Sequence, residues 1–237
     1  MANNRKAVIE DKDFEKEYSQ KGAYHYRLKG FSLWWMDDNY KMLAGYCKKG
    51  TVVLDLACGD GRLYYYLKAR GVKEIVGLDI SLSAIKLAER LTKMRCMVGS
   101  MVDIKKIFAG RLFDIVICSA SFQYLETEEL RRTLNGINSI LRKDGLLVFS
   151  YPNDIRITSP KIINFSEWKA ILRESGFEVL EKRGICLYMP SFLVSVSSIP
   201  ILSLVSYGIY QLYHFVSFFI ANQSYHYVIC SRKGREL

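Results

Sequence analysis

A glycine turn between a strand-like run and a helix constrains this chain most. Residues 52–62 read VVLDLACGDGR, an apolar run of β-forming residues that enters a turn containing Gly59 and Gly61. The next segment, Leu63–Ala69, has helical character. Glycines allow a ligand to approach the backbone closely, and free N–H groups at a helix N-terminus favour negative charge. The stretch therefore predicts a strand, turn and helix that bind a nucleotide-like ligand.

A second apolar run places a carboxylate beside this turn. Residues 76–81 read VGLDIS, so Asp79 comes 20 residues after Gly59 (79 − 59). A carboxylate at the end of the next strand can accept two hydrogen bonds from a ribose diol. A dinucleotide motif requires a third glycine where this chain has Tyr64, which disfavours a dehydrogenase.

The pattern DLACGDG at residues 55–61 resembles the first motif of class I S-adenosylmethionine-dependent methyltransferases. Ala57 stands where many members have the first glycine of the turn. The resemblance covers residues 51 to about 183 and implies S-adenosylmethionine as the cofactor. It also implies a set of cofactor-binding residues, which comprises Asp55, Ala57, Gly59, Asp60, Gly61, Asp79, Ile80, Ser100, Met101, Ser119 and Tyr24.

Strand-like and helix-like segments alternate along the chain. Strands are expected at residues 51–56, 74–78, 96–98, 113–119, about 145–150, from 176 onward and 225–232, with helices at residues 61–70, 82–94, 126–141 and 165–175. This alternation predicts an α/β fold with a doubly wound, mostly parallel, seven-stranded Rossmann-like sheet. We expect Ser81 and Thr127 to be helix N-caps and Gly145 to adopt a positive φ in the turn before the fifth strand.

Two additions to the sheet are expected. Residues 1–50 form an N-terminal helical lid, and residues 51–237 form the methyltransferase domain with a hydrophobic insert at 188–224. In the lid, Tyr24 offers an aromatic face to a sulfonium cation. The alternative is that such rings only pack on the sheet.

The loop after the fourth strand, residues 119–124, faces the transferred methyl group in the resembling family. It contains Gln123 and Tyr124 where many small-molecule members carry a histidine. The candidate catalytic residues are therefore His25, Tyr24 and His214, although a lone histidine is more often structural.

The insert contains no Lys, Arg, Asp or Glu between Arg183 and Arg232. Its segment 199–221 is long enough to cross a bilayer, but a single crossing conflicts with strands that pair on both sides of it. Polar residues draw one narrow stripe on this helix, and they are Ser203, Tyr207, Tyr210, His214 and Ser217. Four roles are possible for this helix, which are peripheral membrane contact through 189–221, contact with a lipid-like substrate, burial within the protein and contact in a homodimer.

Composition narrows the remaining choices. The six cysteines form no C-x-x-C pair or Cys/His cluster, so no metal site is expected. The charged N-terminus is unlike a secretory signal, which favours a cytoplasmic protein. The net charge of +10 is dispersed rather than gathered in a basic run, which makes nucleic acid an unlikely partner.

These features predict a methyltransferase that acts on a small hydrophobic or lipid-like acceptor. The reaction expected is in-line O-methylation that relies on proximity and desolvation. The alternatives are an RNA methyltransferase and a non-catalytic partner subunit with the same fold.

Overall fold

The structure is a computed structural model that describes residues 11–23, 27–152, 163–187, 191–219 and 224–234. Its centre is a seven-stranded sheet in the order β3-β2-β1-β4-β5-β7-β6. The strands are β1 (Val52–Leu56), β2 (Glu74–Asp79), β3 (Arg95–Val98), β4 (Phe113–Ser119), β5 (Leu141–Pro152), β6 (Phe177–Leu187) and β7 (Ser224–Lys233). β7 is antiparallel to both of its neighbours, and the other pairs are parallel. The predicted doubly wound, mostly parallel sheet is confirmed.

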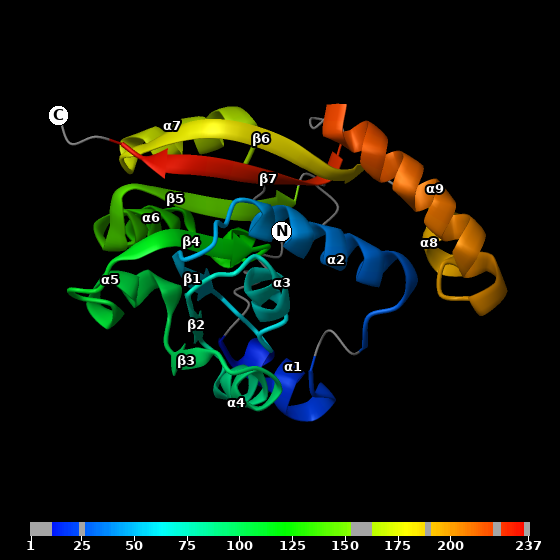
Figure 1. The fold of residues 1–237 in the computed structure, drawn as a ribbon, viewed down its shortest axis with the longest axis horizontal. Coiled ribbons are helices and arrows are strands. Elements are labelled where there is room, and N and C mark those ends of the chain that lie inside the picture. The colour runs from blue at the N-terminus through cyan, green and yellow to red at the C-terminus, as the bar shows by residue number, and fades with distance from the viewer. Residues whose placement is uncertain (1–10, 24–26, 153–162, 188–190, 220–223, 235–237) are drawn as a thin grey trace, which may run out of the picture.

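Helices cover both faces of the sheet (Figure 1). They are α1 (Asp11–Lys21), α2 (Gly30–Gly45), α3 (Leu63–Ala69), α4 (Leu82–Leu91), α5 (Ile104–Ile107), α6 (Thr127–Ile140), α7 (Phe165–Glu174), α8 (Ser191–Val196) and α9 (Pro200–Phe219). One core, which includes Leu134 and Trp168, lies between the sheet and α5, α6 and α7. The other, which includes Leu43, Leu67 and Ala88, lies between the sheet and α2, α3 and α4. Burial of these apolar faces on both sides explains why the inner strands read as nearly continuous hydrophobic runs.

The strand order reverses at β1. β1 pairs with β2 on one side and with β4 on the other, so that Asp55 lies opposite Gly77 and Ile117. The loops that leave β1 and β4 run to opposite faces and leave a crevice at the carboxyl ends of the strands. In open α/β sheets, ligands bind at such a point.

The sequence predicted two helix N-caps, and the structure confirms one of them. Ser81 is the N-cap of α4, because its Oγ accepts a hydrogen bond from the Ala84 N–H at 3.1 Å. The N-cap predicted at Thr127 is wrong, since α6 is capped by Glu126, whose N–H donates to the Glu129 carboxylate at 3.0 Å. A capping box of two glutamates therefore begins this helix.

The positive φ predicted at Gly145 is also wrong. It falls on the preceding residue, Asp144, with φ 61°. Gly145 is needed for a different reason, since a Cβ there would lie 2.8 Å from the Arg142 carbonyl oxygen.

The hydrophobic segment lies between β6 and β7 as the two helices α8 and α9. Because β6 runs parallel to β5, the segment leaves the sheet at the same carboxyl edge as the crevice. α9 extends along the edge of the molecule, beyond the ends of β6 and β7 (Figure 1). No helix among the described residues combines the length and apolarity needed to cross a bilayer.

Candidate functional site

A cavity of about 530 Å³ lies at the carboxyl ends of β1 and β4. Its floor is the turn after β1 and its side is the loop after β4, while α1 and α2 supply the opposite walls. The lining includes Asp55, Ala57, Gly59, Ser119, Ser121, Gln123 and Tyr124 from the sheet edge, with Phe14, Tyr18, Phe31, Trp35, Met36 and Tyr40 from the helices. The cavity thus joins a glycine turn to an aromatic and aliphatic wall.

The turn after β1 has a backbone that few side chains tolerate. Ala57, Gly59 and Gly61 have φ values of 58°, 52° and 79°. Glycine would adopt the left-handed conformation of Ala57 without the cost that a Cβ imposes there. A Cβ on Gly61 would lie 3.1 Å from the Ala88 side chain and 3.2 Å from that of Thr92, so this glycine lets the turn pack on α4.

Asp79 fastens the turn to the next strand. Its Oδ2 accepts a hydrogen bond from the Gly59 N–H at 2.8 Å, and its Oδ1 accepts one from the Ser81 N–H at 2.9 Å. Burial raises the pKa of Asp79, although the hydrogen bonds from Ser81 and Gly59 act in the opposite direction. The 20-residue spacing noted in the sequence therefore brings Gly59 and Asp79 into direct contact.

Asp55 is the most unusual charged group in the cavity. It is 2% exposed, and its Oδ2 has no hydrogen-bond partner among the described residues. Burial raises the pKa of Asp55 well above its usual range, and the neighbouring carboxylates of Asp79 and Asp60 raise it further. A buried carboxylate with an open acceptor position is complementary to a cationic donor such as an ammonium group.

Helix α1 crosses above the turn and the loop. The ring of Phe14 contacts that of Tyr124 with centroids 5.2 Å apart. Glu15 accepts hydrogen bonds from the Ser81 Oγ at 2.8 Å and the Ser83 N–H at 3.1 Å, at the start of α4. A Cβ on Gly59 would lie 2.5 Å from the hydroxyl of Tyr18, which shows how closely α1 approaches the turn.

Sequence reasoning did not identify Glu15 or Tyr18 as site residues. Both lie in a charged helix that resembles an ordinary solvated segment, with a partner for Glu15 that is 66 residues away. No local pattern marks a contact of this range.

Asn39 was also missed, although the sequence does contain a signal for it. It is fully buried, and its Nδ2 donates to the Ser119 Oγ at 2.8 Å. Asn39 lies four residues after Trp35 and four before Leu43, so it is a polar residue on the buried face of α2. Its amide fixes the position of Ser119 at the rim of the cavity.

The other described residues predicted to bind the cofactor are not part of the lining of the cavity, and they are Asp60, Gly61, Asp79, Ile80, Ser100 and Met101. Asp60 is 3% exposed within the turn, and Ile80 follows Asp79. Ser100 uses its Oγ to accept from the Val102 N–H at 3.3 Å, and Met101 packs against the core. Their contact with a cofactor stays a prediction.

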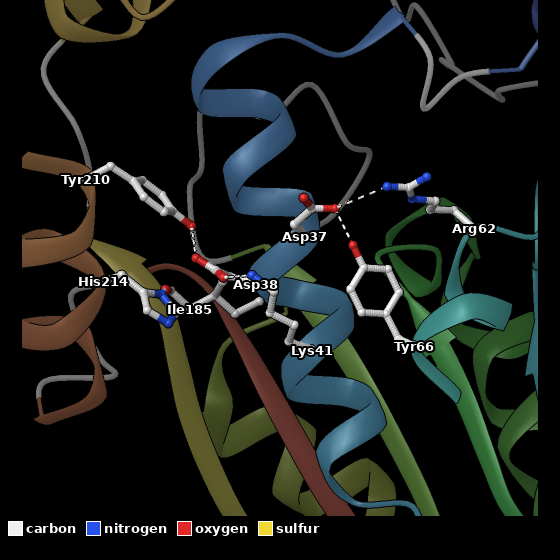
Figure 2. Close-up of polar contacts among 8 residues, drawn as sticks. All are labelled: Asp37, Asp38, Lys41, Arg62, Tyr66, Ile185, Tyr210 and His214. Carbon is white, nitrogen blue, oxygen red and sulfur yellow. Dashed lines mark hydrogen bonds and ion pairs between the residues drawn. The ribbon is translucent and has the colours of Figure 1, made fainter. Parts of the chain in front are cut away.

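The three candidate catalytic residues are not brought together by the described structure. Tyr24 and His25 lie outside the described residues. His214 lies in α9, where its Nδ1 is hydrogen-bonded to the Ile185 carbonyl (Figure 2). The described lining of the cavity includes no histidine.

Comparison with known proteins relates part of this chain to methyltransferases. Residues 53–145 match a family model described as a methyltransferase domain. An uncharacterized protein of Methanocaldococcus jannaschii is 30% identical over 131 residues, which are 54% of this chain and 49% of that protein. The chain spans about half the length of the curated relatives it matches first.

Two solved structures share the fold over most of both chains. An N-methyltransferase from Bradyrhizobium japonicum, in complex with S-adenosyl-L-homocysteine, has a TM-score of 0.67 at 17% identity and covers 94% of this chain and 98% of its own. Magnesium protoporphyrin IX methyltransferase from Synechocystis, with S-adenosylmethionine bound, has a TM-score of 0.61 at 14% identity and covers 94% and 97%.

Proposed function

Because this chain carries a class I S-adenosylmethionine-dependent methyltransferase domain, we propose that the protein methylates a small hydrophobic or lipid-like acceptor on an oxygen atom. One observation carries this proposal. The glycine turn and the loop after β4 open into the same cavity, whose opposite wall consists mainly of apolar and aromatic side chains. A wall of this kind binds a hydrophobic molecule and excludes water.

The residues on the floor of the cavity fit the cofactor. The open Oδ2 of Asp55 is complementary to the ammonium group of its methionine portion, and the Ala57–Gly61 turn allows a close approach to the backbone. Asp79 stays the expected ribose-binding acid, and its bond to Gly59 holds that acid beside the turn. S-adenosylmethionine, when bound, supplies an activated methyl group whose transfer leaves a neutral thioether.

The acceptor side of the cavity is formed by the loop after β4. Asn39 holds Ser119, and the Nε2 of Gln123 donates to the Ala120 carbonyl at 2.5 Å, so both side chains stabilise the loop. A preorganised loop aligns the acceptor with the methyl group, and alignment supplies much of the rate enhancement in such a displacement. We propose an acceptor oxygen that is itself acidic, such as a carboxylate or a phenol, since it reacts with little help from a base.

The electrostatics at the mouth of the cavity favour a small acceptor over RNA. Two cations at this mouth, Lys21 and Arg27, are neutralised locally, because both pair with Glu17, at 2.8 Å and 2.6 Å. A protein that binds a phosphate backbone needs free cations beside its site.

The proposal is tested by incubating the protein with methyl-labelled S-adenosylmethionine and an organic extract of cells. We expect label in a hydrophobic small molecule, and none when Asp55→Asn protein is used at low cofactor concentration. Mild alkali should release labelled methanol if the product is a methyl ester. A phenol methyl ether should keep its label in alkali and lose it only in strong ether-cleaving acid. Label that survives both treatments indicates N- or C-methylation and refutes the oxygen assignment. Label found instead in added total RNA refutes the acceptor class.

A further inference from the structure

Helix α9 exposes most of its large apolar side chains, whereas its buried residues, among those described, are polar. Tyr207, which belongs to the same polar stripe as Tyr210, is 43% exposed. Ser206 and Tyr210 are buried at 2% and 0% exposure, whereas Leu204, Val205 and Leu212 are 79%, 66% and 60% exposed. This is the reverse of an ordinary surface helix, whose apolar stripe faces the core. We call the exposed aliphatic side chains of α9, together with Phe215, the outer face. It comprises Leu202, Leu204, Val205, Leu212 and Phe215.

Polar contacts hold α9 in this inverted orientation. The Tyr210 hydroxyl donates to Asp38 on α2 at 2.8 Å, and the His214 ring is hydrogen-bonded to the Ile185 carbonyl on β6 (Figure 2). Asp38 also pairs with Lys41 at 3.1 Å. Rotation of α9 to bury its leucines would break both of these hydrogen bonds, which opposes the rotation.

Contacts of aromatic rings and the backbone reinforce the same arrangement. Trp34 on α2 packs against Tyr207 and Tyr210 with centroids 5.1 and 5.7 Å apart. The Phe31 N–H donates to the Ser197 Oγ at 3.0 Å, so the loop between α8 and α9 is bound to the start of α2. The outer face is therefore a fixed feature of the folded protein.

We propose that this outer face inserts into the surface of an anionic lipid bilayer, with α9 lying in the plane of the membrane. From Leu202 to Phe215 the outer face forms an apolar strip about 20 Å long. Amphipathic helices bind bilayers by burying such a strip at the boundary between headgroups and acyl chains.

Charge decides between a bilayer and a second copy of the chain. No acidic residue lies between Arg183 and Arg232, and the exposed Lys29 stands beside the loop that Ser197 attaches to α2. The chain carries a net charge of +10, so two copies meeting at this face repel each other, whereas anionic headgroups attract it. When the protein is bound in this way, the carboxyl edge of the sheet faces the lipid. Helix α2 then connects the membrane-bound helix to the cavity, because its Phe31 contacts Tyr210 of α9 and its Phe31 and Trp35 line the cavity.

The test is flotation of the full chain with vesicles of phosphatidylcholine alone or with phosphatidylglycerol added. We expect the wild type to bind the anionic vesicles and to partition at least tenfold more weakly to the neutral ones. The double variant Leu204→Glu/Leu212→Glu should partition to the anionic vesicles at least tenfold more weakly than the wild type. The matched control is Leu112→Glu, because Leu112 is 47% exposed but precedes β4 at the opposite edge of the sheet. Titration with S-adenosylhomocysteine shows that each variant keeps its folded methyltransferase domain.

Two results would overturn the proposal. One is equal flotation of the wild type and the double variant. The other is a wild-type dimer, measured by light scattering without lipid, that the double variant converts to a monomer while neither protein binds vesicles. Both outcomes are independent of the methyl acceptor, so this proposal can fail while the proposed function stands.

Discussion

The substitution Asp55→Asn should stabilise the protein without cofactor and weaken cofactor binding at the same time. Asp55 is 2% exposed, has an Oδ2 without a partner among the described residues, and lies near the carboxylates of Asp79 and Asp60. A buried, incompletely paired charge costs free energy of folding, so its removal should raise the free energy of unfolding by about 1–2 kcal/mol. For a chain of this size that corresponds to an unfolding midpoint roughly 2–8 °C higher.

The same change removes the charge that should hold the cofactor's ammonium group. A hydrogen bond to a charged group is worth about 1.5–3 kcal/mol, so the Kd for S-adenosylhomocysteine should rise about ten- to hundredfold. Thermal unfolding gives the first quantity and calorimetric titration gives the second.

The effect on stability should also depend on pH. The pKa of Asp55 is raised in the folded state, so the unfolded chain loses its proton first as the pH rises above about 4. The wild type therefore loses stability between pH 4 and the folded-state pKa, and the advantage of the Asn variant should grow over that interval and be absent below it.

The control is Asp114→Asn. Asp114 accepts from the Val52 N–H at 2.7 Å and pairs with Arg142 at 2.6 Å, and its pKa is lowered. This variant should lose stability and keep its affinity for the cofactor. If Asp55→Asn also loses stability, or binds S-adenosylhomocysteine as the wild type does, the reasoning about an open buried carboxylate is wrong.

Three further predictions concern the turn, α9 and α1. Gly61→Ala should lower the free energy of unfolding by about 2–4 kcal/mol, because crowding against α4 adds to backbone strain. Gly110→Ala, at φ 78° with open space around it, should lower it by only about 1–2 kcal/mol, and urea titration compares the two variants. Tyr210→Phe removes the hydrogen bond to Asp38 and should cost about 1–3 kcal/mol, with faster hydrogen exchange confined to α9 and α2; uniform exchange would contradict the anchoring contact. Hydrogen bonds from the serines at the start of α4 lower the pKa of Glu15, so Glu15→Gln should lower the unfolding midpoint above pH 4.5. The difference from the wild type should disappear as the pH falls through the folded-state pKa of Glu15, and a difference that persists in acid would contradict this.

Local chemistry made most of the sheet predictable. The apolar runs that end at Asp55 and Asp79, the glycine turn and the cap at Ser81 each depend on neighbouring residues, and each lies where expected. The errors at Thr127 and Gly145 are shifts by one residue. Glu126 caps the helix because Glu129, three residues later, completes a capping box with it. Asp144, and not Gly145, adopts the left-handed conformation.

The sequence by itself determined the fold class, the glycine turn and the presence of an apolar helix with one polar stripe, since these depend on residue types at short spacing. Only the tertiary structure decided that Glu15 and Tyr18 contact the site and that Tyr210 and His214, from the polar stripe of α9, contact the protein. The physical reason is that periodicity shows that a helix has two faces but not which face has a partner. Asp38 and the Ile185 carbonyl, far away in sequence, supplied hydrogen bonds to the polar face and left the leucines exposed.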